Sequence, residues 1–493
     1  MRNKLFTIIW SIFLFLPFVF GQDVLEDQSP KAAWAISFEE VTQLALDNSL
    51  DIQIAKYDAY IKQTSLFKAE SIFDTYFNVN AGYFDDTTKQ PSVVFGTATG
   101  QTNYNFGISK KLPSGTEIAI NAGDARNFTN SPFATLNPYH EASAGISLKQ
   151  PLGKNFFGLA DRAGIKITKI DIENAQYSSL EDIEQALYNA QVAYWKFVLK
   201  CEELKIREGI LQKSQKLYDI YKEKIKIGMV EEVDVVAVEA NLEIRKADVL
   251  IAELEKEQAK NELLFALNID DLSIELAPRD SLDIGPLSVD LYQALTDAIN
   301  NRRDYKQIKN QLLANDINIV VAKNALWPKF DLEASFTRNG LDRKYKPAWE
   351  GISDKNNREL FVGITLEFPL ENRNSKGDFE EARLQKEQNL LSLKRTERLI
   401  FKEIHNQVKQ VNTLKEQVSL YEKTSLLQAK KLEEELKRLK YGRSNSDFII
   451  RYGEDVLNAK LGLAQVLFAY RVSLVDLELV KQTLLDKYWR QEL

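Results

Sequence analysis

Four segments of the chain alternate between apolar and polar residues at every second position. They are residues 77–83, 142–149, 330–336 and 361–368. In the first segment Phe77, Val79 and Tyr83 fall on one face, and Asn78 and Asn80 fall on the other. This period predicts β-strands with one apolar and one polar face. Such strands suit a membrane barrel, but a half-buried strand of a soluble sheet alternates in the same way, so the pattern alone leaves both open.

Two long runs with a different period follow the strands. Residues from about 159 to 227 contain no proline, and residues from about 378 to 441 contain neither proline nor glycine. Apolar side chains recur seven residues apart: Phe197, Leu204, Leu211, Tyr218 and Ile225 in the first run, and Val411, Val418, Leu432 and Leu439 in the second. The runs predict helices on the order of 100 Å long with coiled-coil contacts. A plain dimeric coiled coil would give the same repeat but would leave the strands without a purpose. Shorter amphipathic helices are predicted from 234 to about 267 and from 447 to about 485.

The chain contains the same pattern twice. Residues 145–152 match residues 363–370, and the strand at 77–83 matches the one at 330–336. Downstream, the turn at Gly228 parallels the turn at Gly442. We therefore expect two internal repeats, residues 22–288 and 289–493, each with a helix, strands and a long helical hairpin. The first repeat carries roughly 35 extra residues, which predict an additional hairpin at about 102–123 whose place relative to the other strands stays open.

The N-terminus has the composition of a secretory signal. Arg2 and Lys4 precede an apolar run from Leu5 to Phe20, and small and polar residues follow at Gly21 and Gln22. The run of about 16 residues is shorter than the roughly 20 that a membrane-spanning helix needs. We predict a signal peptide at residues 1–21, with an uncleaved anchor as the alternative.

Composition excludes several classes of protein. Hydrophobic residues make up 44% and charged residues 27%, which fits a folded chain, and the net charge of −7 argues against a nucleic-acid partner. Cys201 is the only cysteine, so no internal disulfide is expected. His140 and His405 lie outside any metal-ligand spacing. With no catalytic constellation either, we expect neither an enzyme nor a bound metal or cofactor.

These motifs, taken in order, resemble those of the outer-membrane efflux protein family, the TolC-like proteins. The resemblance rests on Gly-Ile-Ser-Leu-Lys-Gln-Pro-Leu at 145–152, Gly-Ile-Thr-Leu-Glu-Phe-Pro-Leu at 363–370, Trp327-Pro328 and the hairpin turns 227–234 and 441–447. It implies an α+β fold and a homotrimer. About four strands per protomer would form an antiparallel transmembrane β-barrel, continued by a long periplasmic α-helical coiled-coil tunnel.

The resemblance also implies a function. A TolC-like protein lies in the outer membrane with its helices in the periplasm, and it conducts substrates from a tripartite efflux pump. Its partners would be a periplasmic adaptor (a membrane fusion protein), an inner-membrane transporter and outer-membrane lipid. The alternatives are a type I protein-secretion conduit, a non-conducting periplasmic coiled-coil tether and an adhesin-like surface protein.

The same resemblance places a gate at the helical tip. In the family an aspartate six residues after the first tip glycine helps to keep the tunnel shut, and Asp234 occupies that position. We hypothesise that Asp234 pairs with Arg443 in the closed tip, with help from Tyr441; alternatively, Asp234 caps the returning helix. Asp447 stands one residue from a place where the family often carries a pore-lining aspartate.

The adaptor is expected to contact the two tip turns, which form the far ends of the helical hairpins. By the same resemblance the contact residues would be Lys226, Gly228, Tyr441 and Gly442.

Overall fold

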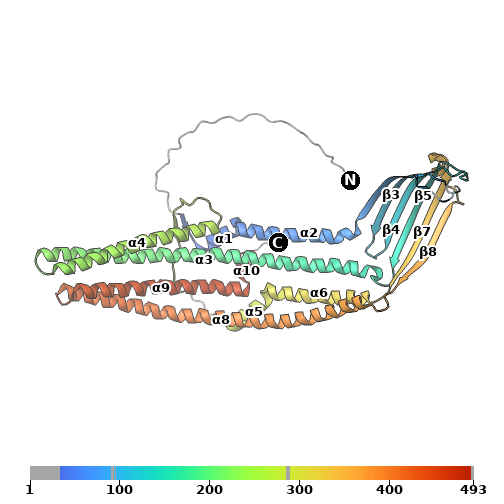
Figure 1. The fold of residues 1–493 in the computed structure, drawn as a ribbon. Coiled ribbons are helices and arrows are strands. Elements are labelled where there is room, and N and C mark those ends of the chain that lie inside the picture. The colour runs from blue at the N-terminus through green and yellow to red at the C-terminus, as the bar shows by residue number, and fades with distance from the viewer. Residues whose placement is uncertain (1–33, 90, 92–93, 95, 285–288, 490–493) are drawn as a thin grey trace, which may run out of the picture.

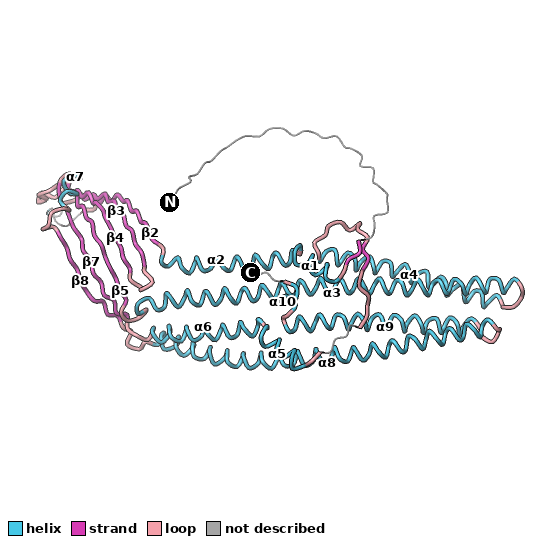
Figure 2. The backbone as a smooth tube through the Cα atoms, turned by 180° about the vertical axis from the view of Figure 1, so that it is seen from behind, coloured by secondary structure: helices cyan, strands magenta, loops and turns pink. Residues whose placement is uncertain are grey.

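The computed structural model describes residues 34–89, 91, 94, 96–284 and 289–489. The molecule is elongated, with a β-sheet at one end and helical hairpins that reach away from it (Figure 1). Both hairpin turns lie at the end opposite the strands (Figure 2). The predicted signal peptide, residues 1–21, lies outside the described residues.

In each half of the chain two helices precede strands of the main sheet, and a long helix and a shorter helix follow them. The first half consists of β1 (Trp34–Ile36), α1 (Phe38–Asn48), α2 (Leu50–Glu70), η1 (Ser71–Phe73), β2 (Thr75–Asp86), β3 (Thr99–Lys111), β4 (Glu117–Thr129), β5 (Tyr139–Pro151), η3 (Phe156–Gly158), α3 (Leu159–Lys226), α4 (Glu232–Ala266) and β6 (Leu276–Pro278). The second half consists of α5 (Leu291–Asn301), α6 (Arg303–Ala325), β7 (Lys329–Asp342), α7 (Tyr345–Gly351), β8 (Arg358–Glu367), α8 (Arg373–Lys440), α9 (Ser446–Lys481) and α10 (Leu484–Tyr488). The α+β fold class is confirmed.

Local sequence signals set the helix ends. Ser37 caps α1: its hydroxyl accepts from the Glu40 amide at 3.3 Å, and the Glu40 carboxylate accepts from the Ser37 amide at 2.9 Å. The long helices α3 and α8 each contain 68 residues, which corresponds to about 100 Å. Within the described part of the chain, none of the helices combines the length and apolar character that a membrane span requires.

The heptad prediction is right for α8 and shifted by one residue for α3. Val411, Val418, Leu432 and Leu439 are buried in α8. In α3 the first predicted position, Phe197, is buried, but further along the buried series is Glu203, Ile210 and Leu217, one residue before the predicted positions. The shift arises because α3 packs against both α4 and α9, and a helix with two partners buries the stripe between them.

Six strands form one sheet, in the order β2-β3-β4-β5-β7-β8, and every neighbouring pair is antiparallel. The expectation of about four strands per protomer is therefore too low. The predicted extra hairpin is β3–β4, and it pairs along its full length with β2 on one side and β5 on the other. A pattern of short-range alternation predicts the strands themselves but not which strands pair, so the sequence left this open.

The sheet has two faces of opposite character. Directly paired residues share a face, and one row across all six strands reads Phe77, Ile108, Ile120, Ile146, Phe336 and Leu360. We call this the apolar face; all six of these side chains are exposed in the protomer. The adjacent row reads Asn78, Gly107, Asn121, Gly145, Thr337 and Glu359 and belongs to the polar face.

The main core lies in the middle of the helical body, where the two halves meet. Tyr194 and Phe197 of α3 are fully buried there, beside Leu263 of α4 and Val475 of α9. A buried ion pair also joins the halves: the Arg303 guanidinium of α6 donates to the Glu184 carboxylate of α3. This core fixes the hairpins relative to the sheet and so determines where the tip lies.

Candidate functional site: the helical tip and the polar face of the sheet

Both hairpin turns at the tip have the same backbone structure. After α3, the Gly228 amide donates to the Ile225 carbonyl at 3.0 Å and the Met229 amide to the Lys224 carbonyl at 3.0 Å. After α8, Gly442 and Arg443 make the two equivalent bonds at 3.1 and 2.9 Å. This is the Schellman motif, whose left-handed position suits glycine, and φ is +69° at Gly228 and +70° at Gly442. The turns place the starts of α4 and α9 side by side.

Asp234 has two roles at the start of α4. One carboxylate oxygen accepts from the Glu231 amide at 3.4 Å, which completes a capping box. The other accepts from the Ser446 hydroxyl of α9 at 3.1 Å. Asp234 therefore caps its own helix and also connects the first hairpin to the second within one protomer.

Tyr221 of α3 lies beneath this connection. Its side chain is buried with Val238, Leu439 and Ile449, so all four tip helices contribute to one small apolar cluster. Burial raises the pKa of the Tyr221 phenol, and the nearby carboxylates of Asp234 and Asp447 raise it further, while a hydrogen bond with Ser446 lowers it. Burial of Tyr221 in this cluster therefore favours the neutral phenol.

The structure does not bring the other predicted gate residues to Asp234. Arg443, Tyr441 and Asp447 are all exposed, and among the described residues of the protomer no ion pair joins Arg443 to Asp234. The Arg443 side chain stays free to meet Asp234 of a neighbouring protomer, so this pairing stays a prediction. Beyond Asp447, the Arg451 guanidinium lies over the Phe448 ring, 4.9 Å from its centroid.

Sequence reasoning did not single out Ser446 or Tyr221. Ser446 was part of the turn motif 441–447, but only the glycine, the tyrosine and the charged residues were given roles. Its bond to Asp234 spans 212 residues, and no local pattern reports a contact of that range. The signal that was available is a hydroxyl at the first position of a helix, a common site for contacts at helix starts.

The predicted adaptor-contact residues Lys226, Gly228, Tyr441 and Gly442 are all exposed at the tip. Large apolar side chains surround them: Ile227, Met229 and Tyr441 are 66%, 70% and 78% exposed. Exposed apolar groups of this size at the end of a long hairpin are typical of a protein-contact surface.

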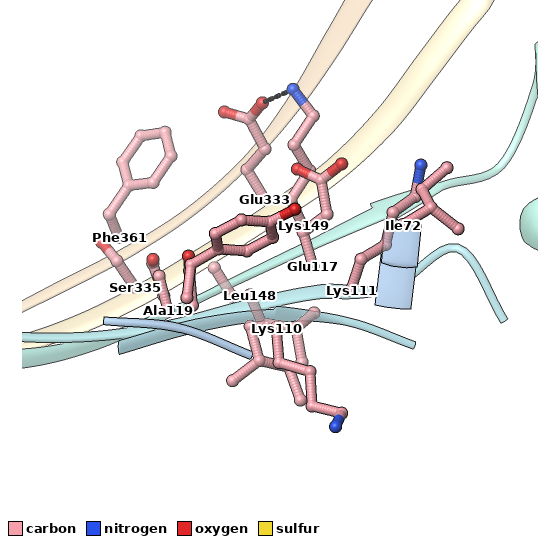
Figure 3. Close-up of a pocket in the computed structure, with 15 residues that line it drawn as sticks. Ile72, Lys110, Lys111, Glu117, Ala119, Leu148, Lys149, Glu333, Ser335 and Phe361 are labelled. Atoms are coloured by element: carbon pink, nitrogen blue, oxygen red, sulfur yellow. Dashed lines mark ion pairs between the residues drawn. The ribbon is translucent and has the colours of Figure 1, made fainter. Parts of the chain in front are cut away.

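The polar face of the sheet is hollowed. A depression of about 680 Å³ at the helical end of the sheet is lined by polar-face residues of all six strands, from Tyr76 on β2 to Phe361 on β8. The Lys149 ammonium lies 3.2 Å from an Asp331 oxygen and 3.1 Å from a Glu333 oxygen, and Figure 3 shows Lys149, Glu333 and Phe361 on the same side of the strands. Lys149 and Glu333 are partly exposed while Asp331 is buried, and charged groups on this face suit a water-filled lumen. Within the described residues no cluster of potential metal ligands occurs.

A two-faced antiparallel sheet joined to long, tip-turned helical hairpins is the architecture of the TolC-like outer membrane channels. Solved structures with this fold include the CmeC channel of Campylobacter jejuni, with TM-score 0.67 and 16% identity over 90% of this chain and 85% of that one. The OprN outer-membrane channel gives TM-score 0.69 and 15% identity over 90% and 89%. The Neisseria gonorrhoeae MtrE channel, in its open state, gives 0.65 and 15% over 90% and 88%. At these identities the likeness establishes the fold.

One segment of the sequence also matches a known family. Residues 294–442, from α5 to the tip turn after α8, match the model of the outer membrane efflux protein family. The match covers this segment of the chain, and the solved structures that share the fold over about 90% of the chain include outer membrane channels. No curated protein matches the chain.

Proposed function

We propose that the protein is a passive exit duct, a homotrimer that conducts substrates from a tripartite efflux pump across the periplasm and the outer membrane. One observation carries the proposal: a single protomer leaves both edges of its sheet, β2 and β8, unpaired. Within a bilayer unpaired backbone groups are costly, so such a sheet requires closure with further copies of itself. Symmetric closure around an axis gives a barrel without edges.

The helices support the same assembly. Large apolar side chains on α4 and α8 are exposed in the protomer, among them Leu250, Leu254, Leu391 and Leu427. Long helices with such a second apolar stripe pack against further helices. Neighbouring protomers would cover these stripes and complete a tunnel.

The tip would hold the gate and the adaptor contact. In the proposed closed state Asp234, Ser446 and Arg443 hold neighbouring hairpins together, with Tyr441 and Asp447 beside them. The apolar surface around Lys226, Gly228, Tyr441 and Gly442 would receive the periplasmic adaptor, and an inner-membrane transporter would supply the energy. We also propose the division into a signal peptide at 1–21 and repeats at 22–288 and 289–493.

Planar-bilayer conductance of the purified protein tests the proposal. We expect small, stable steps for the wild type and clearly larger steps for Asp234→Ala, with Arg443→Ala intermediate. Arg383→Ala is the matched control, because it removes an exposed charge on the body of α8, where, among the described residues, Arg383 pairs with Glu380 of its own helix.

Each outcome separates the alternatives. Conductance steps of equal size in all variants would support the proposed duct but contradict the proposed gate at Asp234. No conductance in any variant would reject the duct in favour of the periplasmic tether. A duct that passes polypeptide from an inner-membrane partner, and not small solutes, would favour the type I secretion conduit.

A further inference from the structure

The hairpin β3–β4 has the dimensions and the alternation of a membrane wall. Each of its strands has 13 residues, as does β5, and a tilted barrel strand needs about 9–11 to cross a bilayer. Ile108 and Phe106 of β3 and Ile120 of β4 fall on the apolar face, in rows shared with β2 and β5. A hairpin that extended into water beyond the membrane would have no reason to keep an apolar band level with that of its neighbours.

The polar face of the hairpin is built around pairs of glycine and asparagine on adjacent strands. Asn103 lies opposite Gly82, and Asn121 opposite Gly107. A Cβ added at either glycine would lie 2.5 or 2.7 Å from the amide oxygen of its partner. Asn105 covers Gly123 in the same way. The asparagine side chains therefore lie flat over the neighbouring strand. This contact fixes the register of the hairpin, and the side chains project little from its polar face.

Lys110 and Arg126 lie on the apolar face near the ends of their strands and are exposed, whereas Asp124 lies further from the end of β4 and is covered by the structure. Asp124 of β4 is 4% exposed. Its carboxylate accepts a hydrogen bond from Nδ1 of His140 at 2.8 Å. The short helix α7 packs over this point: Tyr345 contacts the His140 ring, and Ala348 is fully buried. A carboxylate that would otherwise face lipid is thus shielded, as expected for a strand inside the bilayer.

We infer that β3 and β4 belong to the membrane wall, so that the assembled protein has an eighteen-stranded barrel in place of a twelve-stranded one. The inference rests on the proposed trimer, to which each protomer contributes six strands. With strands about 4.8 Å apart and tilted by about 40°, eighteen strands give a backbone diameter of about 36 Å, against about 24 Å for twelve.

The consequence concerns the size of the cargo. After allowance for a layer of side chains on each side, the bore is about 25 Å, roughly 12 Å wider than in the twelve-stranded case. Because the asparagine side chains of these pairs lie flat against the strands, they occupy little of the bore. The barrel therefore does not limit the passage of bulky hydrated cargo, and the selection by size falls entirely on the helical tip.

Single cysteines in the full-length protein test whether the hairpin lies in the wall. Burial raises the pKa of the native Cys201 thiol to about 11, but Cys201→Ala is still used as the background to remove any residual labelling. Ile108→Cys and Ile120→Cys probe the apolar face of the hairpin, and Asn105→Cys and Asn121→Cys probe its polar face. Ile146→Cys and Ser147→Cys on β5 are the matched controls, in a strand expected in either barrel.

We expect a fluorophore at Ile108→Cys or Ile120→Cys to be quenched by nitroxide-labelled lipid as strongly as one at Ile146→Cys. The labels at Asn105→Cys and Asn121→Cys would escape the lipid quencher and react with a membrane-impermeant maleimide. Quenching at Ile146→Cys without quenching at Ile108→Cys and Ile120→Cys would overturn the inference and leave the duct intact. Absence of quenching at all three positions would instead reject the membrane barrel itself.

A second measurement does not depend on any substitution. Electron cryomicroscopy of the trimer in nanodiscs gives the diameter of the barrel directly. A value near 36 Å supports eighteen strands, and a value near 24 Å overturns them.

Discussion

The Ser446 hydroxyl donates a hydrogen bond of 3.1 Å to the carboxylate of Asp234, and this bond joins the two helical hairpins of one protomer at their tip. Since Ser446 is 2% exposed, water competes little for the hydroxyl. In the proposed gate, this contact inside the protomer would hold the tip, and the proposed contact to Arg443 of a neighbour would add to it.

Ser446→Ala is expected to loosen the closed tip without disturbing the capping of α4. Loss of one partly buried hydrogen bond costs about 1 kcal/mol, which corresponds to a roughly fivefold larger open fraction. Single-channel recording gives that fraction. Asp234→Asn, which keeps an acceptor oxygen for Ser446, should open the tip less than Asp234→Ala. If Ser446→Ala behaves as the wild type while Asp234→Ala opens, the bond between the hairpins does not hold the gate.

The raised pKa of Tyr221 predicts that the proposed closed tip becomes less stable at alkaline pH. The pKa of the buried phenol lies above its ordinary value of 10.0, so the neutral form is favoured in the closed tip. The stabilisation is fully present below about pH 10 and is lost as the pH rises through the raised pKa. Conductance of the wild type should therefore increase as the pH rises above about 10, and that of Tyr221→Phe should not show this step. The same step in both proteins would assign it to another group.

Arg303→Ala is expected to destabilise the helical body strongly. The Glu184 carboxylate is 1% exposed and accepts from Arg303 and from the Leu484 amide at 2.8 Å. Removal of the guanidinium leaves a buried charge without its partner, which costs about 3–5 kcal/mol. Thermal unfolding measures the loss. The control is Arg279→Ala, whose pair with Glu40 is exposed to solvent and should contribute little to stability. Equal shifts for both variants would contradict the role of burial.

Deletion of residues 99–129 should narrow the barrel. The deletion removes β3 and β4 together, and the remaining loop joins the far ends of β2 and β5, whose apolar rows then meet in register. The largest neutral polymer that enters from the barrel side should decrease in diameter about twofold, because the bore narrows from about 25 Å to about 13 Å. Polymer-exclusion conductance measures this limit, and an unchanged limit would mean that the hairpin does not line the bore.

Much of the fold follows from local patterns. The period-two segments became strands, the runs without proline became α3 and α8, and the Ser37–Glu40 capping box is present at α1. Both tip glycines terminate their helices in the left-handed conformation. These features depend on backbone preferences and on neighbours within a few residues, so the sequence is sufficient to predict them.

The candidate site was predictable only in part. The repeat and the family resemblance located Asp234 and the two tip turns, because these lie at fixed distances from the glycines. The partner of Asp234 in the protomer proved to be Ser446, a residue with no distinguishing local pattern.

By itself, the sequence determined the elements, their two-fold repetition and the opposite faces of each strand. The tertiary structure decided which strands pair, and so placed β3–β4 inside a six-stranded sheet. It also decided that Ser446 meets Asp234 and that Arg303 meets Glu184. The reason is physical: strand alternation and helix periodicity are imposed by the chain within a few residues, whereas pairing between distant segments depends on the free energy of the whole packed arrangement.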